Sequence, residues 1–179
     1  MARMILPDGT ETTDATSIVA RLTKLGVGVS HWPVPSDARG KQLLEQKSLD
    51  DGEKTDLLKM LEDRFEKLKR EKGYTARDLV VIHEDVPGLA DMLAKFDKVH
   101  IHTDDEVRYI ISGRGYFGFV EPDGKQFLVE VTAGDFVNVP KNAEHWFEMR
   151  DSKRCKAVRY FGENPSWTPV YTERQRAFA

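Results

Sequence analysis

The sequence has few of the features that direct a chain out of the cell. Its single cysteine, Cys155, cannot form an intrachain disulfide, so cysteine usage gives no support for secretion. No stretch approaches the ~18 apolar residues that a membrane-spanning helix needs. Residues 1–14 also lack the apolar core of a signal peptide. We therefore expect a cytoplasmic protein, with Cys155 as a small strand residue near the core.

The sequence has no excess of charge of either sign and no linker-like tract. Lys and Arg total 27 against 30 Asp and Glu, which gives a net charge of -3. This balance gives no reason to expect nucleic acid or a membrane as partner. We find no internal repeat, low-complexity tract or Ser/Gly linker, so we predict a single domain over residues 1–179 and expect a monomer.

Residues 1–78 are predicted to form a mainly helical N-terminal extension. Asp14 can cap a short helix over residues 15–25. A longer helix is predicted over residues 53–72, because four apolar residues recur at helical spacing: Leu57, Leu61, Phe65 and Leu68. Gly73 would end this helix. We expect its apolar stripe to pack against a sheet.

Residues 79–171 change in character and predict a β-barrel. Residues 79–83 form an apolar run typical of a strand, and one short helix could occupy residues 88–96. From Lys98 onward, short β-rich runs alternate with turn residues, and Pro122–Asp123–Gly124 indicates a hairpin. Regular short strands of this kind favour an antiparallel sandwich or a small barrel.

Two histidines and a glutamate stand at a spacing that suits a metal site. Side chains alternate between the faces of a strand, so His100 and His102 point the same way, with Cα atoms ~6–7 Å apart. That separation lets two imidazoles reach one ion at ~2.1 Å. Three polar residues then allow a turn, after which Glu106 begins a second strand that also carries Arg108 on the same face.

His145 is the fourth candidate ligand. It follows a turn at Pro140 and begins a strand that, in an antiparallel barrel, can lie beside the strand of His100. Three imidazoles and one carboxylate suit iron, nickel, copper, zinc or manganese and do not suit calcium. Four protein ligands on a six-coordinate ion would leave two adjacent positions for a bidentate substrate.

Several other polar residues have simpler interpretations. His31 and His83 fit ordinary core or surface positions, and Asp104 and Asp105 fit a solvated turn. Arg108 could form an ion pair with Glu106, or it could stabilise an anionic oxygen on a substrate. We favour the second role for Arg108.

The two histidine segments resemble the two sequence motifs of the cupin superfamily. In the first motif, His-x-His is followed by Glu and then, after six intervening residues, by Gly; here these are His100, His102, Glu106 and Gly113. In the second motif, Gly and Pro precede His, as Gly134, Pro140 and His145 do here. The match is not complete: Asn142 replaces a motif Gly, Met149 replaces a frequent Asn, and Ala94 replaces a frequent Gly. Asn also tolerates a left-handed turn.

Within the cupins, three segments look like the acireductone dioxygenase family. They are the run DDEVRYI that contains Glu106 and Arg108, the run His145-Trp146-Phe147, and the closing AVRYFGENPSWTPVY with Trp167 and Pro169. The resemblance covers roughly residues 79–171. It implies a mainly β cupin fold, a double-stranded β-helix or jelly-roll barrel, with N-terminal α-helices packed outside.

The resemblance also implies an activity in methionine salvage. The family cleaves 1,2-dihydroxy-3-keto-5-methylthiopentene (acireductone) with O2. With Fe(II) the products are 2-keto-4-methylthiobutyrate and formate, and with Ni(II) they are methylthiopropionate, formate and CO. By residue match, one Fe(II) or Ni(II) per chain is held by His100, His102, Glu106 and His145.

The residues and the resemblance together suggest how such a site would work. The metal would act as a Lewis acid and template for the enediolate. Arg108 and Glu106 are the expected catalytic residues, with Arg108 compensating the negative charge of the substrate. Phe147 is a candidate to shelter the methylthio tail, and equally a candidate for plain core packing.

Two alternatives remain open from the sequence. The first is another metal-dependent cupin enzyme, such as a different dioxygenase, an isomerase or a decarboxylase. An isomerase acting on sugar phosphates would need a set of basic residues, and we identify none. The second is a non-enzymatic metal-binding cupin that acts as a sensor. A DNA-binding regulator is disfavoured because the N-terminal helices show neither a convincing helix-turn-helix nor a basic stripe.

Overall fold

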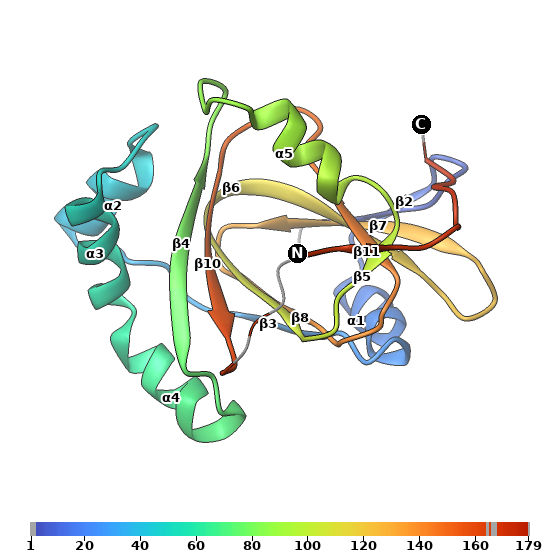
Figure 1. Cartoon of the computed structure of the whole chain (residues 1–179), viewed down its shortest axis with the longest axis horizontal. Helices are drawn as coiled ribbons and strands as arrows, with labels where there is room; N and C mark the ends of the chain where they lie inside the picture. The colour runs from blue at the N-terminus through green and yellow to red at the C-terminus, as the bar shows by residue number, and fades with distance from the viewer. Residues whose placement is uncertain (1–2, 164, 166–167, 179) are drawn as a thin grey trace.

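The computed structural model describes residues 3–163, 165 and 168–178. Its strands form two antiparallel sheets that share one long strand, and three helices lie along one outer side (Figure 1). The helices are α1 (Ala15–Lys24), α2 (Ala38–Glu45), α3 (Asp51–Met60), α4 (Glu62–Lys72) and α5 (Leu89–Phe96). The strands are β1 (Met4–Ile5), β2 (Glu11–Thr12), β3 (Gly28–His31), β4 (Ala76–Ile82), β5 (His100–Ile101), β6 (Glu106–Val120), β7 (Gln126–Thr132), β8 (Asp135–Val139), β9 (His145–Glu148), β10 (Cys155–Phe161) and β11 (Val170–Tyr171).

Strand β6 connects the two sheets because each half pairs with different neighbours. Its first half lies between β10 and β8, which gives the strand order β4-β10-β6-β8-β3. Its second half lies between β9 and β7, which gives the order β11-β5-β9-β6-β7-β1-β2. The two halves meet at Gly113, where the backbone adopts a left-handed φ of 76°. A Cβ atom there would lie 2.1 Å from the carbonyl oxygen of Arg154, so this position requires glycine.

The core divides according to the two faces of the sheets. Alternate residues of β6 point to opposite sides: Ile110 joins a cluster between the two sheets, while Tyr109 and Ile111 join a cluster under the outer helices. The inner cluster also contains Phe117 and Phe127 from the second sheet. The space between the sheets is therefore packed with apolar side chains from both, and the site described below lies within it.

Helices α2, α3 and α4 cover the outer face of the first sheet, as Figure 1 shows beside β4. Their leucines pack against Val107, Tyr109 and Val158 of the sheet; these leucines are Leu43, Leu57, Leu61 and Leu68. The prediction of a mainly β fold with N-terminal helices packed outside is thus confirmed. Among the described strands, no pairing joins β2 or β4 back to the opposite edge, so the barrel is open rather than closed.

The predicted helix at residues 15–25 is confirmed as α1, and the Asp14 side chain caps it by accepting a hydrogen bond from the Ser17 amide. The single helix predicted over residues 53–72 is wrong. Two helices, α3 and α4, meet at Leu61, whose ψ of 14° interrupts the helical backbone. We attribute the break to packing, because it lets the leucines of both helices stay buried along one curved sheet face.

Residues 1–78 also contribute strands to the sheets. β1 pairs with β7 in the second sheet, and β3 pairs with β8 in the first. We propose that these pairings make the N-terminal segment part of one domain with residues 79–171. The predicted strand at 79–83 overlaps β4, which begins earlier and ends at Ile82, and the predicted helix at 88–96 corresponds to α5. No helix in the part of the chain that the structure describes is long and apolar enough to cross a membrane.

Candidate metal centre

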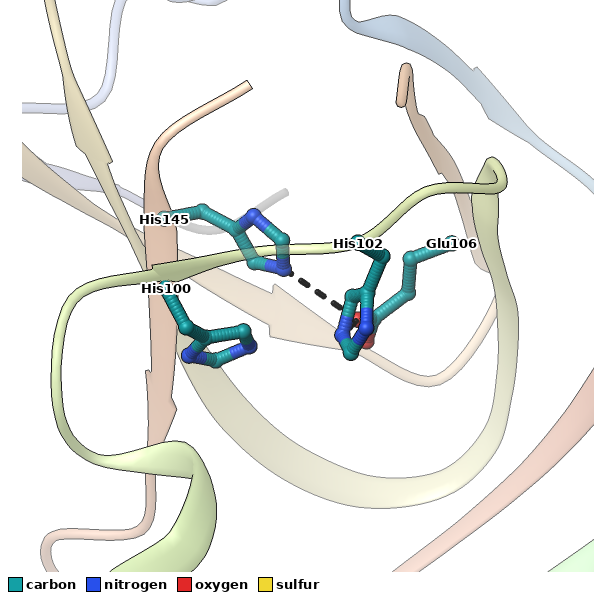
Figure 2. Close-up of side chains that lie close together, drawn as sticks. All are labelled: His100, His102, Glu106 and His145. Atoms are coloured by element: carbon teal, nitrogen blue, oxygen red, sulfur yellow. Dashed lines mark hydrogen bonds and ion pairs between the residues drawn. The ribbon is translucent and has the colours of Figure 1, made fainter. Parts of the chain in front are cut away.

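Four side chains that are distant in sequence meet between the two sheets. They are His100 on β5, His102 just after it, Glu106 at the start of β6, and His145 at the start of β9. The strand pairing explains how they meet, because His100 lies directly opposite His145 in the β5–β9 ladder. Figure 2 shows the imidazoles of His100, His102 and His145 directed toward a common centre together with the Glu106 carboxylate.

The four side chains are close together and buried. One ligand atom from each lies within 4.8 Å of all the others. The residues are 1% (His100), 6% (His102), 9% (Glu106) and 1% (His145) exposed. The shortest separation to the carboxylate joins His102 Nε2 and Glu106 Oε2 at 2.9 Å, and His145 Nε2 lies 3.2 Å from the same oxygen.

Backbone carbonyl groups set the orientation of two of the rings. Nδ1 of His100 donates to the carbonyl oxygen of Lys98 at 2.7 Å, and Nδ1 of His145 donates to that of Ala143 at 2.8 Å. These bonds place the proton on Nδ1 and leave the lone pair of Nε2 pointing to the centre of the cluster. Metal-binding histidines in proteins are typically held in this way by hydrogen bonds from their second nitrogen.

The turn before His145 is tied to the strand of the other histidines. Asn142, at the position of a motif glycine, has a φ of 65°, so it adopts the left-handed conformation that asparagine tolerates. Its amide donates to the carbonyl oxygen of His102 at 2.9 Å. The departure from the motif at Asn142 therefore preserves the turn.

Several buried nitrogens in the cluster need a partner. Nε2 of His100 and both ring nitrogens of His102 have no hydrogen-bond partner among the described residues, although His102 Nε2 lies near Glu106 without hydrogen-bond alignment. Buried polar atoms are rarely left unsatisfied in this way, because desolvating them costs free energy. A divalent cation would satisfy these nitrogens and the carboxylate together, so the residues present fit a metal ion.

The protonation states in the cluster also suit a metal. Burial pushes the pKa of the Glu106 carboxyl up, but the charge of Arg108 and the nearby imidazoles hold it well below its usual value. Burial lowers the pKa of His100 to about 4, and the neighbouring His145 contributes to the shift. At neutral pH, Glu106 is therefore a carboxylate and His100 is a neutral imidazole, which are the forms that bind metals.

Arg108 lies beside the cluster and binds its carboxylate. Its Nη2 is 3.2 Å from Oε1 of Glu106, and its Nη1 donates to the carbonyl oxygen of Val107 at 3.0 Å. Burial lowers the pKa of Arg108, while the charge of Glu106 opposes this change. The ion pair considered from the sequence is therefore present, and it leaves Oε2 of Glu106 to face the imidazoles.

A cavity of about 100 Å³ opens on the cluster between the sheets. His100, Glu106 and Arg108 form its polar wall. The remaining lining is mostly apolar: Val80, Ile82, Met92, Leu93, Phe96, Ile110, Phe117, Phe147, Cys155 and Ala157, together with Arg159. A second cavity of about 110 Å³ lies on the other side of Glu106 and is bordered by Asp104 and Phe161.

The structure places the other sequence candidates as follows. Phe147 and Cys155 line the cavity, and both also pack in the core between the sheets. His31 is largely exposed near Asp135 and lies outside the cluster, in agreement with its ordinary interpretation. Asp105 accepts a hydrogen bond from the Lys141 amide, which ties together the two loops that carry ligand candidates. Trp167 lies outside the described residues.

Sequence reasoning missed two groups of cavity residues. The first is the apolar face of α5, which includes Met92, Leu93 and Phe96; a helical period was visible, but its target was not. The second is Arg159, which lies directly opposite Arg108 in the β6–β10 ladder. Only the pairing of these two strands, about fifty residues apart in sequence, could have indicated its position.

Taken together, the fold and the site define a class of protein. Two antiparallel sheets that share a strand enclose His-x-His, a glutamate and a third histidine at the ends of β5, β6 and β9. This arrangement is that of a metal-binding cupin.

Comparison with known proteins identifies the family within this class. The model of the ARD/ARD' family matches residues 13–169. The acireductone dioxygenase of Microcystis aeruginosa is 49% identical over 173 residues, which cover 97% of this chain and 94% of that protein. The acireductone dioxygenase of Leptospira biflexa is 50% identical over 163 residues, which cover 91% of this chain and 90% of that protein. The chain therefore belongs to the ARD/ARD' family.

A solved structure agrees with the sequence comparison. The acireductone dioxygenase from Bacillus anthracis, which holds a cadmium ion in its active centre, superposes with a TM-score of 0.84 at 32% identity. The match covers 96% of this chain and 98% of that chain. The cupin fold expected from the sequence is thus confirmed over nearly the whole length.

Proposed function

We propose that this chain is a metal-dependent dioxygenase that cleaves acireductone, 1,2-dihydroxy-3-keto-5-methylthiopentene, with O2. One observation carries the proposal: three buried imidazoles and one carboxylate converge beside a mainly apolar cavity, in a chain that belongs to the ARD/ARD' family. The relatives at 49% and 50% identity are acireductone dioxygenases, and their names suggest the substrate. We infer that the reaction serves methionine salvage.

We infer that His100, His102, Glu106 and His145 hold one Fe(II) or Ni(II) per chain. Both ions accept imidazole and carboxylate ligands, so either fits this donor set. When bound, the ion would supply a Lewis acid and a template that orients the enediolate toward O2. The Fe(II) form would yield 2-keto-4-methylthiobutyrate and formate. The Ni(II) form would yield methylthiopropionate, formate and CO.

We infer that residues of the chain orient the substrate, balance its charge and exclude water. We infer that Glu106 acts both as a ligand and as the carboxylate that orients Arg108, with which it forms an ion pair. The Arg108 guanidinium faces the cavity and would compensate the negative charge of the enediolate, with little competition from water because the site is buried. Phe96, Phe147 and Ile82 line the cavity and would exclude water around the methylthio tail.

A direct test of the proposal loads the protein with Fe(II) and Ni(II) separately and supplies acireductone and O2. We expect oxygen uptake with both forms, with CO among the products of the Ni(II) form alone. Oxygen uptake with a different diol but none with acireductone would favour another cupin enzyme. No uptake with any enediol would favour a sensor. The cytoplasmic location and the monomeric state remain predictions from the sequence.

A further inference from the structure

Two arginines face each other on neighbouring strands beside the candidate metal centre. Arg159 of β10 is the direct register partner of Arg108 of β6, and both side chains line the cavity. Residues directly opposite in an antiparallel pair have Cβ atoms ~4.5–5.5 Å apart, and like charges at such positions destabilise the sheet. A like-charge pair of this kind is unfavourable for folding, and a role in ligand binding would compensate for it.

Asp78 of β4 fixes the guanidinium of Arg159. The two residues are register partners in the β4–β10 ladder. Nε of Arg159 donates to Oδ1 of Asp78 at 2.8 Å, and Nη2 donates to Oδ2 at 2.5 Å. A bidentate contact of this kind fixes the orientation of the guanidinium plane. Asp78, Arg159 and Arg108 therefore form a row across three strands, which ends beside Glu106.

The row stands where the two cavities meet. Only a few residues line both the apolar cavity and the outer cavity near Phe161: Phe96, Glu106, Arg108 and Arg159. The Arg159 side chain is 24% exposed, whereas Asp78 is 45% exposed. A small ligand in either cavity would therefore lie close to both arginines.

We propose that Arg159 is a second anion-binding residue of this site, which together with Arg108 grips the oxygen atoms of an anionic enediolate. Asp78 is its positioning residue, because it holds the guanidinium without entering the cavity lining. A ligand with one or two negative charges between the arginines would relieve their mutual repulsion. Binding would therefore offset the unfavourable free energy of the cross-strand pair. The inference rests on the proposed function for the identity of the substrate, but not for the charge of the ligand.

The test compares Arg159→Met with Arg154→Gln as a matched control. Arg154 immediately precedes β10 and pairs with the exposed Glu84, away from both cavities. Each variant is loaded with Ni(II), and its metal content and melting temperature are measured. Ascorbate, a stable enediolate anion, is then titrated without O2 by calorimetry. We expect Arg159→Met to keep its metal and to bind ascorbate at least about tenfold more weakly, as loss of a charged hydrogen bond predicts.

Two further variants distinguish anion binding by Arg159 from a purely structural role of this residue. Arg159→Lys keeps the positive charge but loses the planar guanidinium with its paired N–H donors. Its affinity for ascorbate should therefore lie between those of the wild type and Arg159→Met. Asp78→Asn should weaken ascorbate binding less than Arg159→Met does, because the guanidinium remains but is held less firmly. In steady-state oxygen uptake, Arg159→Met should raise KM more than it lowers kcat.

The outcomes are distinguishable. Unchanged ascorbate affinity in Arg159→Met, or loss of metal in that variant, would overturn the inference, since the residue would then be only a part of the sheet. A third outcome is that Arg159→Met loses ascorbate affinity while the wild-type protein consumes no O2 with acireductone. The anion-binding role of Arg159 would then be supported, and the proposed function would be wrong.

Discussion

Arg108 binds one oxygen of Glu106 and leaves the other to the three histidines. Nη2 of Arg108 lies 3.2 Å from Oε1, while Oε2 lies 2.9 Å from His102 Nε2. The carboxylate is therefore held on one side by a fixed cation, while His102 and His145 lie close to its second oxygen. Figure 2 shows the side chains on the histidine side of the carboxylate. Under the proposed function, this division would let Arg108 affect the reaction without being a ligand.

Replacement of Arg108 should separate metal binding from activity. Arg108→Ala should keep the metal, because the four ligand side chains remain, and it should lose activity equivalent to about 2–4 kcal/mol of transition-state stabilisation. The measurement is kcat/KM for oxygen uptake together with the metal content of the same sample. Arg108→Lys should recover only part of the activity, because lysine lacks the planar fork. Unaltered kinetics in Arg108→Ala would leave this residue a structural ion pair.

The Gly113 position should not accept a side chain. Gly113→Ala would place a methyl group 2.1 Å from the Arg154 carbonyl oxygen at a φ of 76°, so the strand bend would have to shift. We expect a loss of about 2 kcal/mol or more in the free energy of unfolding, measured by urea denaturation. Gly162→Ala is a suitable control, because nothing lies within 4 Å of a Cβ there. Equal stability of the two variants would show that β6 bends elsewhere.

The Cys155 thiol should be unreactive in the folded protein. Burial raises its pKa from the ordinary value of 9.0 to about 12, so the thiolate that reacts with disulfide reagents is scarce at pH 8. We expect slow modification by Ellman's reagent in buffer and fast modification in guanidinium chloride. Rapid modification of the native protein would show that the cavity admits the reagent.

The same shift predicts a dependence of stability on pH. Between about pH 9 and pH 12 the folded thiol keeps its proton while the unfolded thiol loses it, so the contribution of Cys155 falls as pH rises through this range. Cys155→Ala should therefore lose less stability than the wild type between pH 8 and pH 10. A parallel decline of both proteins would remove Cys155 as a cause.

The ligand candidates could be predicted because their geometry is largely local. His100 and His102 share a face through the period of a strand, and Glu106 follows after one short turn. The position of His145 was harder to predict, because its place beside His100 depends on the pairing of two strands. The turn at Pro140 nevertheless indicated where the strand of His145 begins. Its side chain is 1% exposed within the cluster, as the metal hypothesis requires.

What the sequence did not reveal depends on contacts between distant segments. Arg159 and Asp78 join the site through ladders that only the folded chain displays. The break at Leu61 likewise has no local signal, because the apolar period continues through it without a glycine or proline. Local patterns indicate which face of an element is buried, but not which element covers it.

The most direct test of the whole account is the metal content of purified protein loaded with Fe(II) or Ni(II), measured by elemental analysis for the wild type and for His102→Ala. His83→Ala is the control, because His83 directly follows β4 and lies outside the ligand cluster. We predict one metal ion per chain in the wild type and in His83→Ala, and loss of the ion and of oxygen uptake in His102→Ala. A His102→Ala protein that still held one equivalent of metal would contradict the four-residue centre.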